Sequence, residues 1–160
     1  MGRVWPRQGG QGLAVQQGVR LHVDTFALKS ATDGATVTFS PIDAREFTVL
    51  VEVRGSNVHA SGVVYAFMPH RFITDYFDDL AKSWRGWTGE KCWSSLENEL
   101  TFRATADSVG HITLAFELRL GPYATDWTVS GTVALEAGQL ERIASEAENF
   151  FEGLGLLRAI

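Results

Sequence analysis

Histidine and cysteine are the residue types best suited to catalysis or metal binding, and this chain holds few of them. Its one cysteine, Cys92, excludes an intrachain disulfide and a cysteine-rich zinc site. The Lys91 ammonium group beside it would stabilise a thiolate, although a lone cysteine is more often incidental. The histidines lie far apart in the sequence, at His22, His59, His70 and His111. We therefore expect no catalytic residue, no bound metal and no cofactor.

The chain also lacks the sequence motifs of common enzyme classes. It contains no P-loop, no dinucleotide-binding glycine fingerprint, no zinc-protease helix motif and no nucleophile elbow. We therefore predict a protein that is not an enzyme. The alternative is a small-ligand-binding protein or enzyme with an apolar pocket between sheet and helix, into which folding brings a few polar groups. The candidate ligand-binding residues for that alternative are His59, Tyr65 and His111.

Three aspartates are candidates for binding a partner. Asp75, Asp78 and Asp79 lie on the polar side of a predicted helix, and residues 75 and 79 repel each other because they are one turn apart. A metal ion or a basic partner would relieve that repulsion, and a basic partner would be attracted by the local negative field. The competing interpretation is a solvated helix face, with Arg71 and Lys82 nearby to balance the charge.

Three tryptophans within ten residues follow the aspartates. Trp84, Trp87 and Trp93 surround Gly86 and Gly89, and tryptophan is enriched at binding hot spots. Trp84 continues the apolar stripe of the helix, so we expect it in the core. Trp87 lies between the two glycines, so we predict that it is exposed and anchors a partner. The competing interpretation buries all three as core residues.

Hydrophobic periodicity predicts the elements that must position these side chains. Apolar and polar residues alternate in four segments, which predicts strands over 19–24, 36–39, 46–54 and 58–67. An apolar stripe from Phe72 to Trp84 predicts a helix, followed by a loop over 85–93. Three further alternating segments predict an antiparallel meander over 96–104, 112–120 and 127–135. A stripe over 140–151 predicts a second helix, which ends at Gly153.

The predicted fold class is therefore α+β, with an antiparallel sheet of about seven strands: four strands, a helix, a three-strand meander and a C-terminal helix. A closed or strongly curled sheet is the alternative, because seven strands need their edges protected. Alternate residues of the meander should face one core: Leu100, Phe102, Leu114, Phe116, Val129 and Val133. Small residues on one face of 58–67 would let another layer approach closely: Ala60, Gly62, Val64 and Ala66.

Length and charge limit the remaining classes. A chain of 160 residues suits one domain, which we place over 19–153, between a flexible leader (1–18) and a C-terminal tail (154–160). The net charge of −5 and the absence of a basic patch argue against nucleic acid as a partner. No apolar run reaches the roughly 20 residues that a membrane helix needs, and the first residues lack an apolar signal core. We therefore expect a cytoplasmic protein with no membrane partner.

Several short stretches are similar to a known family. They are Tyr76–Ala81, Trp84–Trp87, Trp93–Glu97, Asp107, Gly110–His111 and Glu136–Leu140. Over roughly residues 45–152 the chain resembles an uncharacterised family of small bacterial proteins, common in actinobacteria, that has no assigned activity and no established catalytic residues. More distantly, the layout is similar to immunity proteins of the WapI type. That resemblance implies a protein that binds and neutralises a cognate toxin domain.

Three functions remain open. The first is a non-catalytic binding protein, in its sharpest form an immunity protein, that meets a basic partner such as a toxin domain through Asp75, Asp78, Asp79 and Trp87. The second is the small-ligand protein or enzyme described above. The third is a structural subunit that forms a homo-oligomer through a sheet edge.

Overall fold

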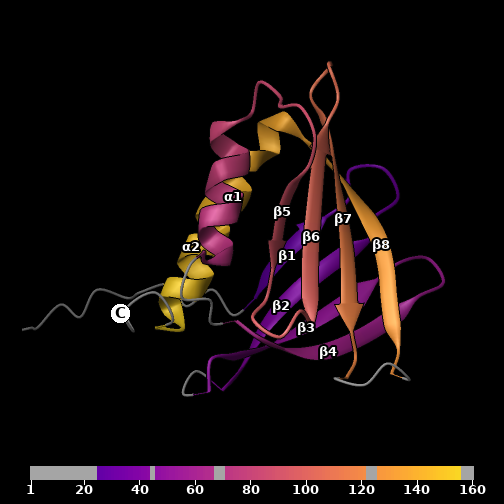
Figure 1. Cartoon of the computed structure of the whole chain (residues 1–160), viewed down its shortest axis with the longest axis vertical. Coiled ribbons are helices and arrows are strands. Elements are labelled where there is room, and N and C mark those ends of the chain that lie inside the picture. Colours follow the sequence, from indigo (N-terminus) through magenta and orange to yellow (C-terminus); the bar gives the residue numbers. More distant parts are fainter. Residues whose placement is uncertain (1–24, 44–45, 67–70, 122–125, 156–160) are drawn as a thin grey trace, which may run out of the picture.

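The computed structural model describes residues 25–43, 46–66, 71–121 and 126–155. Within these residues the chain forms two four-stranded antiparallel sheets, and each sheet is followed by a helix (Figure 1). The predicted leader, the predicted strand over 19–24 and the last five residues lie outside the described residues. The α+β class with antiparallel strands and two helices is confirmed, whereas the number of strands differs slightly from the prediction.

The first sheet is a meander in the order β1-β2-β3-β4. Its strands are β1 (Phe26–Lys29), β2 (Thr36–Asp43), β3 (Thr48–Arg54) and β4 (His59–Tyr65). Alternate residues of the first three strands are buried, as the period-two pattern requires. β2 runs two residues beyond Pro41, where its register with β3 shifts. Proline is tolerated there because β1 pairs only with residues 36–39 of β2.

The second sheet is a meander in the order β5-β6-β7-β8. Its strands are β5 (Lys91–Ser94), β6 (Leu100–Ala106), β7 (His111–Arg119) and β8 (Thr128–Glu136). The predicted inward residues of β6 and β7 are buried, and Val133 of β8 is buried with them. Val129 is only half-buried. The core of the meander is thus confirmed except at that position.

The two helices pack against each other beside the sheets (Figure 1). They are α1 (Ile73–Lys82) and α2 (Leu140–Gly153), the latter preceded by a short 3-10 turn, η1 (Ala137–Gln139). Each buries one apolar stripe, which for α1 consists of Ile73, Tyr76, Phe77 and Leu80. None of the helices in the described part of the chain is long and apolar enough to cross a bilayer.

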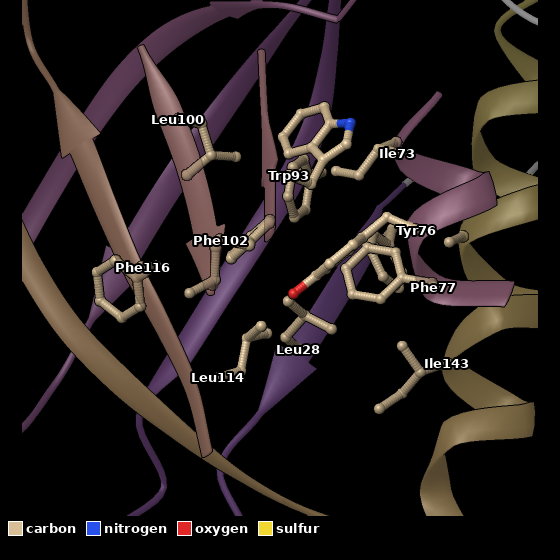
Figure 2. Packing of buried hydrophobic residues seen from close by; sticks show 14 of the residues in the cluster. Leu28, Ile73, Tyr76, Phe77, Trp93, Leu100, Phe102, Leu114, Phe116 and Ile143 are labelled. Carbon is tan, nitrogen blue, oxygen red and sulfur yellow. The ribbon is translucent and has the colours of Figure 1, made fainter. Parts of the chain in front are cut away.

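Aromatic side chains join both sheets and both helices into one core. Phe26 of the first sheet lies edge-on to Phe77 of α1, with ring centroids 5.5 Å apart, and 6.4 Å from Phe150 of α2. Tyr76 of α1 stacks on Phe102 of the second sheet at 6.2 Å. Figure 2 shows Tyr76 and Phe77 pointing from α1 toward Phe102 and Leu28. The helix stripe is therefore fixed by both sheets at once.

Small residues of β4 let the second sheet approach, as the sequence predicts. A Cβ atom on Gly62 would lie 3.0 Å from Leu120 Cδ2 and 3.4 Å from Leu118 Cδ1. On the same face of β4, Val64 is buried, as is Ala66 just beyond the strand. A larger side chain at position 62 would press against the side chains of Leu118 and Leu120.

The division into sheets and three of the strands differ from the prediction. The residues divide into two sheets of four, whereas the sequence predicts one sheet of about seven strands. β5 lies inside the predicted loop, because a four-residue strand with one buried side chain, Trp93, is too short to show a period. β6 begins only at Leu100, because Asn98 adopts a left-handed φ of 58° in the turn before it. β1 is likewise a four-residue strand that no long pattern marks.

Candidate binding surface

The first turn of α1 sets the position of Asp75. The side chain of Asp75 accepts a hydrogen bond from the backbone N–H of Phe72, at 3.0 Å. This contact satisfies one of the donors that a helix start leaves without an intrahelical partner, and the carboxylate also favours the positive end of the helix dipole. Asp75 therefore helps to begin the helix, in addition to lying on its exposed side.

Asp79 is held by two cations on the side of α1 that faces β5. Its carboxylate lies 3.1 Å from Arg71 Nη2 and 2.8 Å from Lys91 Nζ. Close by, the Tyr76 hydroxyl donates to the Lys91 carbonyl at 3.1 Å, and burial raises the pKa of that phenol. Because its charge is neutralised inside the chain, Asp79 contributes little to the field that a partner would meet.

Asp78 lies on the other side of α1. It pairs with Lys82 one turn later, at 2.5 Å, and this carboxylate raises the pKa of the Lys82 ammonium group. Both side chains are exposed, so solvent screens the pair.

The exposure of Trp84 and Trp87 is the reverse of what the sequence predicts. Trp84, predicted to lie in the core, is 56% exposed, because α1 ends at Lys82 and the chain leaves the helical stripe. Its ring lies 5.1 Å from the Arg85 guanidinium. Trp87, predicted to be exposed, is half-buried, and its indole N–H donates to the Ala104 carbonyl at 3.2 Å. Trp93 is only 5% exposed, and its indole N–H donates to the Arg71 carbonyl.

A groove runs between the exposed sides of α1 and α2. One hollow, of about 360 Å³, lies along both helices, lined by Thr74, Asp75, Asp78, Ala81, Glu141, Ala144, Ser145 and Glu148. A second, of about 460 Å³, shares Asp78, Ala81 and Glu141 with the first and is bounded by Trp84, Lys82, Ala137 and Gly138. We call the two together the α1–α2 groove. Asp79 and Trp87 are not among its lining residues.

The α1–α2 groove is acidic, with an exposed aromatic side chain at one end. Four carboxylates line it, on Asp75, Asp78, Glu141 and Glu148, against a single lysine. Among the described residues, Glu141 and Glu148 have no ion-pair partner, whereas Arg142 of the same helix pairs with Glu146. Ala81 and Ala144 contribute only methyl groups to the lining, which keeps the groove open.

Sequence reasoning missed the two glutamates and Trp84. The acidic residues of the second helix are visible as a polar face in the sequence. Nothing in one sequence says that this face lies beside the aspartates of the first helix. That neighbourhood depends on the packing of α1 against α2, which are separated by the whole second sheet in the chain.

The three candidate ligand-binding residues are not brought together. His59 opens β4 and pairs with Glu52 at 3.2 Å, while Tyr65 ends the same strand, about 20 Å away along it. His111 begins β7 in the other sheet, where its Nδ1 lies 2.8 Å from Asp107 Oδ2. This contact raises the pKa of His111. In the described part of the chain, no group of three or more His, Cys, Asp and Glu residues is arranged to hold a metal ion.

The fold and the groove together define a class: an α+β domain of two four-stranded sheets with a helix after each. The chain belongs to a family of unknown function, DUF6228, whose model matches residues 28–153. This confirms that the family is uncharacterised.

Solved structures and curated proteins give two further comparisons. One solved structure, described as "Crystal structures of trypanosoma bruciei MRP1/MRP2", is similar to this chain with a TM-score of 0.41 and 12% sequence identity. The similarity covers 84% of this chain and 86% of that one. It is too distant to inform function. No curated protein matches the chain.

Proposed function

We propose that this protein is a non-catalytic binding protein that receives a basic segment of another protein in its α1–α2 groove. The sharper form of the proposal is an immunity protein that neutralises a toxin domain in the cytoplasm. The actinobacterial setting and the distant resemblance to WapI-type immunity proteins belong to this sharper form. Nucleic acid and membrane are not part of the proposal.

The observation that carries the proposal is the pair of glutamates without an ion-pair partner among the described residues. Glu141 and Glu148 lie on the same side of α2, seven residues and thus about 10 Å apart. Two cationic side chains at a similar spacing would satisfy both carboxylates. Charge complementarity of this kind speeds association and selects against acidic partners.

Trp84 supplies the apolar part of the surface. It is the tryptophan that bounds the groove, and large aromatic side chains often contribute most of the binding energy at an interface. Asp75 and Asp78 from the sequence prediction remain in this surface. Asp79 and Trp87 are left out of it, because each is held by contacts within the chain.

The test is a capture experiment with charge-matched variants. Tagged wild-type protein is incubated with lysate of the source cells, and retained proteins are identified, purified and measured by calorimetry. We expect a basic partner whose affinity falls at least about tenfold in Glu141→Lys/Glu148→Lys and when salt is raised, because screening weakens charge pairs. Trp84→Ala should weaken it similarly.

Two matched variants serve as controls. Glu46→Lys/Glu97→Lys makes the same change in net charge on exposed turns of the sheets, and Trp127→Ala removes another exposed tryptophan. Both should keep wild-type affinity. If the groove variants, still folded by circular dichroism, bind as tightly as the controls, the groove is not the binding site.

A further inference from the structure

The free edge of β4 carries backbone groups that point away from its own sheet. The Tyr65 N–H donates to Glu99 Oε1 at 3.2 Å, on the side opposite β3. Alternate residues of a strand turn their N–H and C=O groups to the same side, so His59, Ser61 and Val63 also face this free edge. Of the described residues, none forms a hydrogen bond with the backbone of Ser61 or Val63.

Other contacts of the hairpin agree with this assignment. The Ala66 N–H donates to the Phe47 carbonyl, so residue 66 and its alternates face β3. Glu99 blocks the edge at Tyr65 only. The open portion therefore runs from His59 to Val63.

β4 lacks the protection that sheet edges usually have. Natural edges carry charges, proline, bulges or a covering element, because an open edge can pair with another chain. β4 contains no Asp, Glu, Lys, Arg or Pro, and pairs with β3 over its whole length without a bulge.

The edge of β5 in the second sheet is different. It is four residues long, and two groups from α1 and the residues before it bind its carbonyls. Arg71 donates to the Cys92 carbonyl at 3.2 Å and Tyr76 donates to the Lys91 carbonyl at 3.1 Å. The Ser95 N–H donates to the Leu100 carbonyl of β6, so in this register Cys92 faces the free edge of β5 and Lys91 faces β6. Arg71 thus binds an edge carbonyl of β5, whereas none of the described residues forms a hydrogen bond with the backbone of Ser61 or Val63.

The described residues leave a hollow beside β4. The hollow has a volume of about 640 Å³ and is lined by Leu50, Ser61, Gly62, Val63, Glu97, Glu99, Arg119, Leu120 and Gly121. β4 is also the edge of the first sheet opposite β1, the strand that contacts α2, so the helices leave it open (Figure 1).

We propose that the β4 edges of two copies of this chain pair antiparallel about a two-fold axis at Ser61. This register places Ser61 of one copy opposite Ser61 of the other, and His59 opposite Val63. Each of these pairs faces the shared edge, so the pairing joins the two first sheets into one eight-stranded sheet and uses every open backbone group between His59 and Val63.

The side chains favour a second copy over a charged partner. Val63 is 56% exposed, and its cross-strand neighbour Leu50 extends the same apolar surface. With no carboxylate or ammonium group in β4, the net charge of −5 is not concentrated at the contact. One strand pair buries less than the ~1,000 Å² typical of stable interfaces, so the dimer should be weak and dependent on concentration. The site is separate from the α1–α2 groove.

Hydrogen exchange and sedimentation of the wild-type protein test this directly. In a concentration series up to about 1 mM, we expect a monomer–dimer equilibrium. The amides of Ser61 and Val63 should exchange quickly in dilute protein and slowly in concentrated protein, while those of Ala60 and Val64 stay protected throughout. A monomer at all concentrations, or unchanged exchange at Ser61 and Val63, would overturn the proposal.

Matched variants locate the edge. Val63→Lys should raise the dimer dissociation constant at least about tenfold, whereas Val109→Lys, at a valine 73% exposed in the turn between β6 and β7, should not change it. Ser61→Pro removes an edge-facing N–H without removing a hydrogen bond between β3 and β4, and should also abolish the dimer. Thr132→Pro is the matched control. It also removes an edge-facing N–H, but on β8, where the neighbouring edge residue Ala134 is bound by Ser30 and Ala31. Loss of the dimer in Thr132→Pro but not in Ser61→Pro or Val63→Lys would contradict the assignment to β4.

Discussion

The two sides of α1 carry the same residue types with opposite surroundings. On the side that faces β5, Asp79 lies between Arg71 and Lys91, and Tyr76 and Trp93 donate to backbone carbonyls nearby. On the side that faces α2, the carboxylates of the groove outnumber the cations. Ion pairs and hydrogen bonds tie the first side to β5, and the second side lines the groove in which we propose that a partner binds. A carboxylate on a helix therefore takes its role from the neighbouring element.

The largest difference between the sides should appear in the free energy of unfolding. Phe77→Ala removes a fully buried ring that contacts Phe26 and Phe102, so we expect a loss of about 3–5 kcal/mol. Trp84→Ala removes a larger but exposed ring and should change stability by less than about 0.5 kcal/mol. Urea denaturation of both variants measures this. Equal losses would show that Trp84 belongs to the core.

The next difference concerns the aspartates. Asp79→Asn leaves Arg71 and Lys91 without their shared carboxylate, and we expect a loss of about 1 kcal/mol because the site is only partly screened. Asp78→Asn breaks one exposed pair and should lose less than Asp79→Asn. Denaturation at low and high salt measures the loss in both variants, and the difference between the two losses should be smaller at high salt. A larger loss of stability for Asp78→Asn would show that the ion pair on the groove side of α1 stabilises the fold more than the contacts of Asp79 do.

Asp75 belongs to both groups, because it lines the groove and also accepts a hydrogen bond at the start of α1. Asp75→Ala should cost about 0.5–1 kcal/mol through the lost hydrogen bond to the Phe72 N–H. Asp75→Asn keeps an oxygen acceptor and should recover most of that loss while removing the charge. Thermal unfolding of the two variants separates the hydrogen bond from the charge. An equal loss in both would assign the effect to the charge alone.

The sequence predicts these roles only where a long pattern carries them. Residues of β6 and β7 alternate over seven and nine positions, so the burial of Phe102 and Leu114 could be predicted. β5 could not, because its four residues carry one buried side chain. Trp84 was misplaced because the stripe continues in the sequence after the helix has ended at Lys82. The α1–α2 groove depends on contacts between distant segments, which one sequence does not contain.

The smallest effect should come from His111, which lies on neither side of α1 and serves as a reference for an exposed pair. Its contact with Asp107 raises the pKa of His111 and, together with the backbone N–H groups of His111 and Val109, lowers that of Asp107. A raised histidine pKa adds stability that is fully present below the unfolded value of about 6.5 and is lost as pH rises through the folded value. The lowered pKa of Asp107 adds stability that is present above about 3.9 and is lost as pH falls through its folded value. The contribution of the pair should therefore be greatest between about pH 4 and 6.5.

Denaturation at several pH values tests this window. The wild type should lose a small part of its stability between about pH 6 and 8, and His111→Gln should remove that part of the slope. The matched variant His59→Gln alters a second exposed histidine–carboxylate pair among the described residues, that with Glu52, and should leave the His111 contribution in place. Because Asp107 also accepts hydrogen bonds from the backbone of Val109 and His111, Asp107→Ala should destabilise the turn at every pH, whereas His111→Gln should act only where the imidazole is charged. A pH slope that is the same in His111→Gln and in the wild type would mean that this pair adds nothing measurable to the stability of the fold.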